Sequence, residues 1–220
     1  SATNILKKSK LPILFFSLEM SKEQLMYRVL ASETNINSTR LRAGNIKQSE
    51  WDILNSTVKR FSRLPLFIDD TPNVSIAEIR KKIKKIRFEQ QKLGLIIVDY
   101  LQLMENSNKN ENRVQELSQI TRSLKNIARE FNVPVIVLSQ LSRNVENRVN
   151  KRPILSDLRE SGSIEQDADL VLMLYRDEYY NTETEEPNIT ELIISKHRNG
   201  PIGTTKILFE GEYTKFKNLN

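Results

Sequence analysis

The chain has 220 residues, 34 of them Lys or Arg and 28 Asp or Glu, which gives a formal net charge of +6. This length suits one sizeable α/β domain, and the positive balance favours nucleic acid over an acidic small molecule as partner. Cysteine is absent and His197 is the only histidine, which excludes disulfides, thiolate or His-cluster metal sites and Ser-His or Cys-His triads. No apolar run approaches the roughly 20 residues of a membrane span.

Apolar runs alternate with helical patterns through residues 11–140. The continuous apolar run 11–18 predicts a parallel strand that is covered on both faces. Capping boxes at 21–24 and 75–78 open two helices, because each pair of side chains satisfies backbone N–H groups of the first turn. Strands are predicted at 11–18, 64–68, 93–98 and 133–139, and helices at 48–60 and after Ser21, Ser75 and Arg113.

Three of these helices have clear apolar faces. The spacing predicts that helix 48–60 buries Trp51, Leu54 and Val58. The helix after Ser75 carries six Lys and Arg side chains on its other face, and a solvated surface explains them better than a specific DNA contact. The core positions expected of the other two helices are Ile79, Ile83 and Ile86, and Val114, Leu117, Ile120, Leu124 and Ile127.

The second half of the chain adds two polar segments and a set of shorter strands. Residues 105–113 are predicted to form a mobile loop, and 141–156 a long basic loop with a functional role. Strands are predicted at 169–175, 189–195 and 203–210, the last two forming an antiparallel meander with 213–216. The fold class is therefore α/β: a mainly parallel twisted sheet with helices on both faces and a C-terminal antiparallel hairpin region.

Polar residues follow three of the predicted parallel strands. Glu19, Asp99 and Gln140 should converge at one edge, because ligands of such sheets bind beyond the carboxyl ends of the strands. An acid that activates water, an acid that holds magnesium and an amide near the terminal phosphate make a nucleotide hydrolysis site. Taken singly, Glu19 also fits a helix-entry acid, Asp99 a turn residue and Gln140 a solvent-facing amide. Asp69 and Asp70 are interpreted as a turn before Ser75.

Five motifs in order resemble the DnaB-type replicative DNA helicases, and the likeness covers nearly the whole chain. They are SLEM at 17–20, DYLQL at 99–103, LSQLSR at 138–143, DLRESGSIEQDAD at 157–169 and KHRNGP at 196–201. The run from Arg159 to Asp169 is the most specific of them. The resemblance implies a RecA-like motor in a homo-hexameric ring, which hydrolyses ATP with Mg²⁺ between subunits and moves along single-stranded DNA.

The resemblance also implies a role for each matching residue. Glu19 would polarise the attacking water, Asp99 would hold the magnesium shell through water, and Gln140 would sense the terminal phosphate. Arg28 would reach the nucleotide phosphates of its own subunit. Lys196 and Arg198 would enter the neighbouring subunit's site, where cations stabilise charge on the transferred phosphoryl group.

A second set of residues resembles the family's DNA-contacting loop. Arg159, Glu160 and Gly162 match the loop that follows the DNA backbone in the ring's channel. Gly162 would let a phosphate approach the chain closely, and such contacts carry no base sequence. Glu160 fits equally well as a salt-bridge partner that positions Arg159. His197 stands where the family usually has another residue, and we interpret it as a neutral variation.

One family motif is missing from these residues. No G-x-x-x-x-G-K-[ST] phosphate loop occurs, and residues 1–6 resemble the helix that directly follows it. Residues 1–220 are thus expected to form a helicase ATPase domain that lacks its first strand and phosphate loop, and to be inactive in isolation. A fragment, a split gene and a self-splicing insert before Ser1 would each explain this.

Two other functions remain open at the level of sequence. One is a different RecA-like ATPase, such as a recombinase, and the other is a non-catalytic DNA-binding or oligomerisation module, which the missing loop favours. Abundant Lys, Asn and Ile indicate an AT-rich genome, so we expect the stroma of a plastid or the cytoplasm of a bacterium. Primase and a helicase loader are further expected partners, and a membrane is not.

Overall fold

The computed structural model describes residues 2–104 and 113–219, so the predicted loop 105–113 lies almost wholly outside the described residues. The chain divides into two compact units. The first unit comprises Ser1–Met26, Ser56–Gln140 and Glu160–Asp167, and the second comprises Tyr27–Asn55, Leu141–Arg159 and Ala168–Asn220. Within the described residues, no helix combines the length and apolar character of a membrane span.

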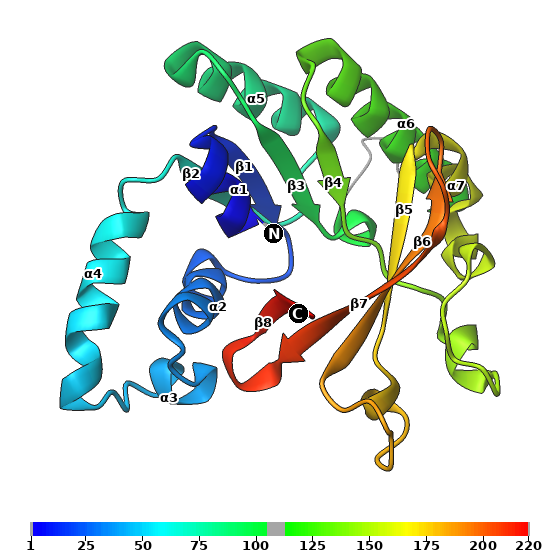
Figure 1. The fold of residues 1–220 in the computed structure, drawn as a ribbon. Helices are drawn as coiled ribbons and strands as arrows, with labels where there is room; N and C mark the ends of the chain where they lie inside the picture. The colour runs from blue at the N-terminus through cyan, green and yellow to red at the C-terminus, as the bar shows by residue number, and fades with distance from the viewer. Residues whose placement is uncertain (1, 105–112, 220) are drawn as a thin grey trace. The chain divides into compact units, whose positions relative to one another are not determined.

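The first unit is built on a four-stranded parallel sheet in the order β2-β1-β3-β4 (Figure 1). The strands are shorter than predicted, and each lies within one residue of its predicted range. The register of β1 and β3 sets Ser17 opposite Asp99, so the two strands end side by side. The strand bounds are β1 Ile13–Ser17, β2 Leu66–Asp69, β3 Leu95–Asp99 and β4 Val135–Val137.

Helices cover both faces of this sheet, as predicted. Alternate strand residues such as Phe16 and Val98 form one core with helices α5 (Ile76–Gln90) and α6 (Arg113–Phe131). The residues between them, such as Ile13 and Ile97, form a second core with Leu6 of α1 (Ala2–Ser9). Burial of both strand faces explains why these strands have continuous apolar sequences.

The capping boxes are confirmed. Ser75 Oγ accepts a hydrogen bond from the Glu78 N–H, and the Glu78 carboxylate accepts one from the Ser75 N–H. Ser21 and Gln24 form the same pair before α2 (Lys22–Thr34). The predicted apolar face of α5 is buried, and that of α6 is buried except for Val114, which is exposed. The basic side of α5 is partly solvated: Lys81, Lys84 and Lys85 are exposed, whereas Arg80 pairs with Glu130.

The prediction for helix 48–60 was partly wrong. A 3₁₀ turn at Gln48–Glu50 leads into α4 (Trp51–Phe61), but Trp51 and Val58 are 42% and 47% exposed. The buried positions are Leu54, Thr57 and Phe61. The predicted and the observed buried sets share Leu54, and both have helical spacing. The predicted set was preferred because all three of its side chains are large and apolar. The helix is rotated so that a buried threonine replaces the tryptophan.

The second unit contains a small helical core and an antiparallel sheet. Ala31, Ile36, Leu41 and Leu54 form the core, with α3 (Ser38–Arg42) held by a two-pronged ion pair from Arg40 to Glu50 at 3.0 and 2.8 Å. The sheet order is β5-β6-β7-β8, so the meander includes one strand more than predicted. The strand bounds are β5 Leu170–Tyr175, β6 Ile189–His197, β7 Gly203–Glu210 and β8 Lys215–Asn218.

Candidate functional site

Two predicted acids lie at adjacent strand ends in the first unit. The Leu18 N–H donates to the Asp99 carbonyl at 2.7 Å, which fixes the exit of β1 against the end of β3. Ser17 Oγ donates to the Met20 carbonyl at 2.7 Å and folds the turn that presents Glu19. Glu19 is exposed and Asp99 is half-buried. The structure therefore brings these two carboxylates to one edge of the sheet.

Gln140 reaches the same edge from β4. The Leu138 N–H donates to the Val98 carbonyl at 2.9 Å, continuing the pairing of β3 and β4 to their ends. Sequence reasoning missed the residue that shapes this exit, Gln102. Its Nε2 donates to Ser139 Oγ at 3.0 Å and to the Gln140 carbonyl at 3.2 Å, and its Oε1 accepts the Gln140 N–H at 3.2 Å. The signal was the DYLQ run, where a polar amide follows an apolar strand.

The acids at the end of β2 lead into the turn before Ser75, as predicted: Asp69 is the last residue of the strand and Asp70 follows it. Lys22 Nζ lies 3.0 Å from Asp70 Oδ1, and the Lys22 N–H donates to Asp70 Oδ2 at 3.0 Å. These contacts hold the pKa of Asp70 below its usual value, the backbone hydrogen bond contributing most. Asp69 pairs with Lys82 and accepts the Thr71 N–H at 3.0 Å. Both carboxylates are occupied by structural contacts.

The donor set at this edge suits a magnesium ion bound by a nucleotide. Within the described residues, no group of three or more His, Asp or Glu side chains gathers as a protein-only metal cage would require. Mg²⁺ in nucleotide sites takes one or two carboxylates and completes its shell with phosphates and water. Asp99, at the end of an apolar strand, fits that single-carboxylate role.

In the second unit, an irregular strand places the predicted pair of cations. Between Val171 and Leu172 the register of β5 and β6 shifts by one residue, so Ser195 has no partner and Lys196 lies opposite Val171. This β-bulge puts Lys196 on the same face as Glu191, which lies opposite Tyr175. Bulges commonly reorient a side chain in this way next to functional sites.

Arg198 lies at the turn between β6 and β7. Its N–H donates to the Asp169 carbonyl at 2.8 Å, and its Nη1 lies 3.0 Å from Asp169 Oδ1. Both side chains are substantially exposed, at 44% and 58%. The turn is tightened by His197, whose Nδ1 lies 3.3 Å from the Pro201 carbonyl oxygen. Arg198 therefore faces solvent with a weak carboxylate partner. Arg28 is also exposed, on α2.

The segment with the predicted DNA contacts is helical. Residues Leu155–Ser161 form a 3₁₀ helix with a kink at Leu158, and α7 (Gly162–Asp167) follows directly. The expected loop through Arg159, Glu160 and Gly162 is thus a junction of two helical turns. The side chains of residues 159–163 lie outside the described part of the structure. The end of α7 is fixed by Thr121 Oγ1, which donates to Asp167 Oδ2 at 2.9 Å.

The loop before this junction is more ordered than its composition suggests. Arg148 donates to both carboxylate oxygens of Asp157 at 3.1 and 2.7 Å, and Arg152 donates to both oxygens of Glu191 at 2.9 and 2.7 Å. The two acids are buried. Arg148 and Arg152, two cations of the predicted basic loop, are therefore neutralised within the unit.

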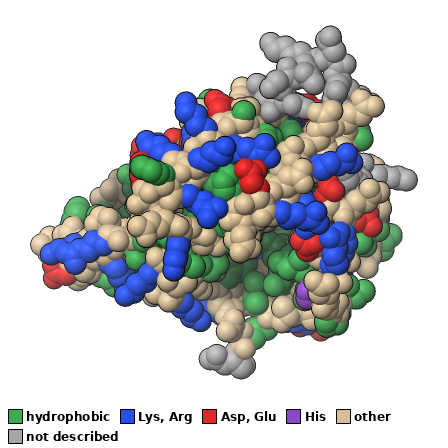
Figure 2. Space-filling model, turned by 90° about the horizontal axis from the view of Figure 1, so that it is seen from above, with side chains coloured by type: hydrophobic (Ala, Val, Ile, Leu, Met, Phe, Trp, Pro, Cys, Tyr) green, Lys and Arg blue, Asp and Glu red, His purple; other side chains and the backbone are tan. Residues whose placement is uncertain are grey.

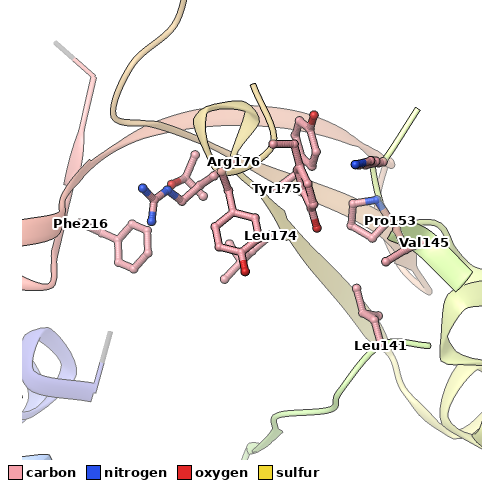
Figure 3. A pocket seen from close by; sticks show the side chains of 11 residues that line it. Leu141, Val145, Pro153, Leu174, Tyr175, Arg176 and Phe216 are labelled. Carbon is pink, nitrogen blue, oxygen red and sulfur yellow. The ribbon is translucent and has the colours of Figure 1, made fainter. Parts of the chain in front are cut away.

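A pocket of about 210 Å³ opens in the second unit between this loop and the antiparallel sheet (Figure 3). Aromatic and cationic side chains line it. Sequence reasoning missed this pocket, although the tyrosines of residues 175–180, at and just after the end of β5, were a signal. Tyr180 stacks on Tyr175 and lies under Lys151, whose Nζ is 4.8 Å from the ring centroid. The buried Thr190 hydroxyl in the lining has no hydrogen-bond partner among the described residues.

Cationic side chains are also frequent on the outer surface. Figure 2 shows Lys and Arg side chains spread over one face, with fewer Asp and Glu side chains among them. This distribution fits the excess of basic residues in the sequence. A surface of this kind attracts polyanions without selecting among them.

The fold and the strand-end residues define a RecA-like helicase ATPase architecture. A solved structure described as an ATPase domain matches with a TM-score of 0.96 at 40% identity, covering 100% of this chain and 78% of that one. A DnaB-like replicative helicase, described together with its interactions with primase, matches with a TM-score of 0.95 at 40% identity over 100% and 53% of the two chains.

The family follows from the sequence comparison. The model described as DnaB-like helicase C terminal domain matches residues 1–218, and the chain belongs to this family. A probable replicative DNA helicase of Trieres chinensis is 68% identical over 98% of this chain and 48% of its own length. The replicative DNA helicase DnaC of Bacillus subtilis is 52% identical over 99% and 48%. The chain thus spans about half the length of the curated relatives it matches.

Proposed function

We propose that the chain is the motor part of a replicative DNA helicase, which couples ATP hydrolysis to movement along single-stranded DNA and to unwinding. The observation that carries this proposal is the placement of Glu19 and Asp99 at adjacent strand ends, joined through the Leu18 N–H. Membership of the DnaB-like family supports it. All the expected catalytic residues are present in the sequence, which favours a motor over a non-catalytic binding module. They are Glu19, Asp99, Gln140, Lys196 and Arg198.

Each site residue has a separate task in this proposal. Glu19 accepts the proton of the attacking water, and Gln140 contacts the terminal phosphate from the end of β4. Asp99 would hold the Mg²⁺ shell, and the ion supplies charge neutralisation at the phosphates. Arg28 binds nucleotide phosphates. Lys196 and Arg198 reach the site of the neighbouring subunit, where cations stabilise the transferred phosphoryl group.

The pocket of the second unit fits the base of a nucleotide. Its volume of about 210 Å³ is smaller than the roughly 300–1,000 Å³ of sites that hold a whole ligand. Aromatic faces next to Lys151 and Arg176 favour a flat ring. The Thr190 hydroxyl, which has no hydrogen-bond partner among the described residues, offers a hydrogen bond. We therefore propose that this pocket takes a flat aromatic ring such as a nucleobase.

The phosphate loop is absent from this sequence, and one sheet edge fits the strand that would carry it. Among the described residues β4 pairs with β3 only, and Ile136 and Leu138 are 45% and 44% exposed. A further parallel strand on this edge would satisfy its backbone groups and cover apolar surface. We propose that the complete protein supplies a first strand and phosphate loop here, and that residues 1–220 alone do not hydrolyse ATP.

The wider assembly follows from the same proposal. Arg159, Glu160 and Gly162 contact the DNA backbone, which suits a motor that must run on any sequence. The full-length protein forms a homo-hexamer, and primase and a loader are its partners, as the solved relative described with primase suggests. A bacterial cytoplasm or a plastid stroma is the proposed location, supported by the relatives in Bacillus subtilis and Trieres chinensis.

The decisive experiment is Glu19→Gln in the full-length protein. We expect DNA-stimulated ATP hydrolysis to fall by about 100-fold or more, because the water loses its proton acceptor, while ATP binding persists. Glu23→Gln is the matched control, since Glu23 is an exposed acid in the first turn of α2. Turnover and nucleotide affinity are measured with and without single-stranded DNA. Retained turnover in Glu19→Gln, or an equal loss in the control, would contradict the proposed role.

A further inference from the structure

Two buried carboxylates of the second unit bind arginines from the same loop. Glu191 on β6 is 8% exposed and accepts two hydrogen bonds from Arg152, and Asp157 is 5% exposed and accepts two from Arg148. A carboxylate that meets two guanidinium N–H groups is held in direction as well as in distance. These are therefore specific contacts and not loose surface pairs.

The two ion pairs form one continuous chain. Arg148 Nη2 also donates to the Arg152 carbonyl at 3.0 Å, which joins the pairs to each other. Asp157 holds the rest of the loop as well: its Oδ2 accepts the Ile154 N–H at 2.8 Å, and its carbonyl accepts the Ser142 N–H at 2.9 Å. Loop 142–157 is thus fastened to itself and, through Arg152, to β6.

The chain of contacts ends at two functionally distinct places. At one end, Asp157 precedes Arg159 by two residues in the 3₁₀ helix. At the other end, Glu191 shares a face of β6 with Lys196, because the bulge at Ser195 turns Lys196 to that side. Arg152 is also clamped from the neighbouring strand, with its guanidinium 4.6 Å from the ring centroid of Tyr175. A displacement at either end would be transmitted through two buried carboxylates that have little solvent to replace their arginine partners.

We propose that Glu191 and Asp157 are positioning residues that couple the DNA-contacting segment to the cation-bearing strand. Through Arg152 and Arg148 they hold the helical turn that precedes Arg159 to β6. A phosphate that engages the segment therefore changes the placement of Lys196 and Arg198. Neither carboxylate touches nucleotide or DNA, and the inference rests on the proposed function.

The test uses the full-length protein with Glu191→Gln and, separately, Arg148→Gln. ATP hydrolysis is measured without DNA and with single-stranded DNA. We expect the DNA-stimulated rate to fall about tenfold, within the range that coupling residues produce, while the unstimulated rate and the KM for ATP stay unchanged. Lys206→Gln is the matched control, because Lys206 lies on β7 of the same sheet and forms an exposed ion pair with Glu186, and we expect no effect of its loss.

A charge exchange separates coupling from simple stability. Arg152→Glu combined with Glu191→Arg keeps the ion pair in reversed polarity and should recover most of the DNA stimulation. If Glu191→Gln does not fold, the exchanged pair carries the test alone through its ratio of stimulated to unstimulated rates. Unchanged stimulation in the single variants, an equal fall of both rates, or an exchange variant that folds but is not stimulated would overturn the inference. A wild-type protein without DNA stimulation would instead overturn the proposed function.

Discussion

The parallel sheet β1–β4 is covered by helices on both faces, whereas the antiparallel sheet β5–β8 exposes Leu170, Leu172 and Leu174 along its first strand. The two sheets also place their polar residues differently. In the parallel sheet, Glu19 and Asp99 meet because neighbouring parallel strands end at the same edge. In the antiparallel sheet a bulge and a turn orient Lys196 and Arg198. The strand topology therefore places the two acids, whereas local irregularities of one strand and its turn orient the two cations.

Core truncations should give the largest contrast between the sheets. Ile96→Ala removes a side chain that is fully buried between two layers and should lower the free energy of unfolding by about 3–4 kcal/mol. Leu172→Ala trims a side chain that is 48% exposed and should cost less than about 1 kcal/mol. Urea unfolding of the two variants measures both values. Losses of similar size would show that the exposed strand face is packed in solution.

A helix cap of the first unit should have a smaller effect. Ser75→Ala removes the hydroxyl that accepts the Glu78 N–H and should cost about 1 kcal/mol. Ser118→Ala is the matched control, because that hydroxyl donates to the Val114 carbonyl inside α6, where alanine is the better helix former. The same unfolding experiment compares them. A cost in Ser118→Ala as large as in Ser75→Ala would refute the capping argument.

An effect of similar size, and the one that depends on pH, concerns Tyr175 in the second unit. Burial, together with its hydrogen bond to Asp177, raises the pKa of Tyr175 to about 12. In the unfolded chain the phenol ionises near pH 10. The stability that protonated Tyr175 adds to the folded state is therefore complete below pH 10. It is lost as the pH rises from about 10 to 12.

Tyr175→Phe removes this contribution. At pH 7 the variant should be less stable by about 1 kcal/mol, because Asp177 loses a donor. The difference in unfolding free energy between the wild-type chain and the variant should then shrink as the pH rises through 10 to 12. Because the other tyrosines ionise alike in both proteins, their effect on stability cancels in this difference. A difference that stays constant up to pH 12 would show that Tyr175 ionises normally.

Most of the parallel unit could be predicted from the sequence, because its signals are local. Continuous apolar runs gave the strands, and hydroxyl–carboxyl pairs such as Ser75 and Glu78 gave helix starts. The fold class and the family are confirmed by the comparisons. The buried face predicted for α4 was wrong. Two overlapping sets of residues have helical spacing, and the larger apolar side chain of Trp51 made it a more plausible core residue than Thr57. The catalytic and DNA-binding roles of the site residues stay predictions.

What could not be predicted depends on residues far apart in the chain. Nothing in the run around Ser195 marks it as unpaired, because a bulge is a property of two strands and not of one. The basic loop looked like free charge, since the partner of Arg152 is Glu191 on a strand 39 residues later. Gln102 acts on Ser139 in the same long-range way. Such pairs become visible only when the register is known.

The bulge at Ser195 makes the orientation of two cations a matter of parity. Side chains on a strand alternate between faces, so one additional residue reverses every position that follows it. Lys196 and Arg198 are two residues apart and share a side in either case, and the extra residue Ser195 decides which side that is. In this hairpin, regular pairing of Ser195 with Val171 would turn both cations to the opposite face without any change in the amino-acid sequence.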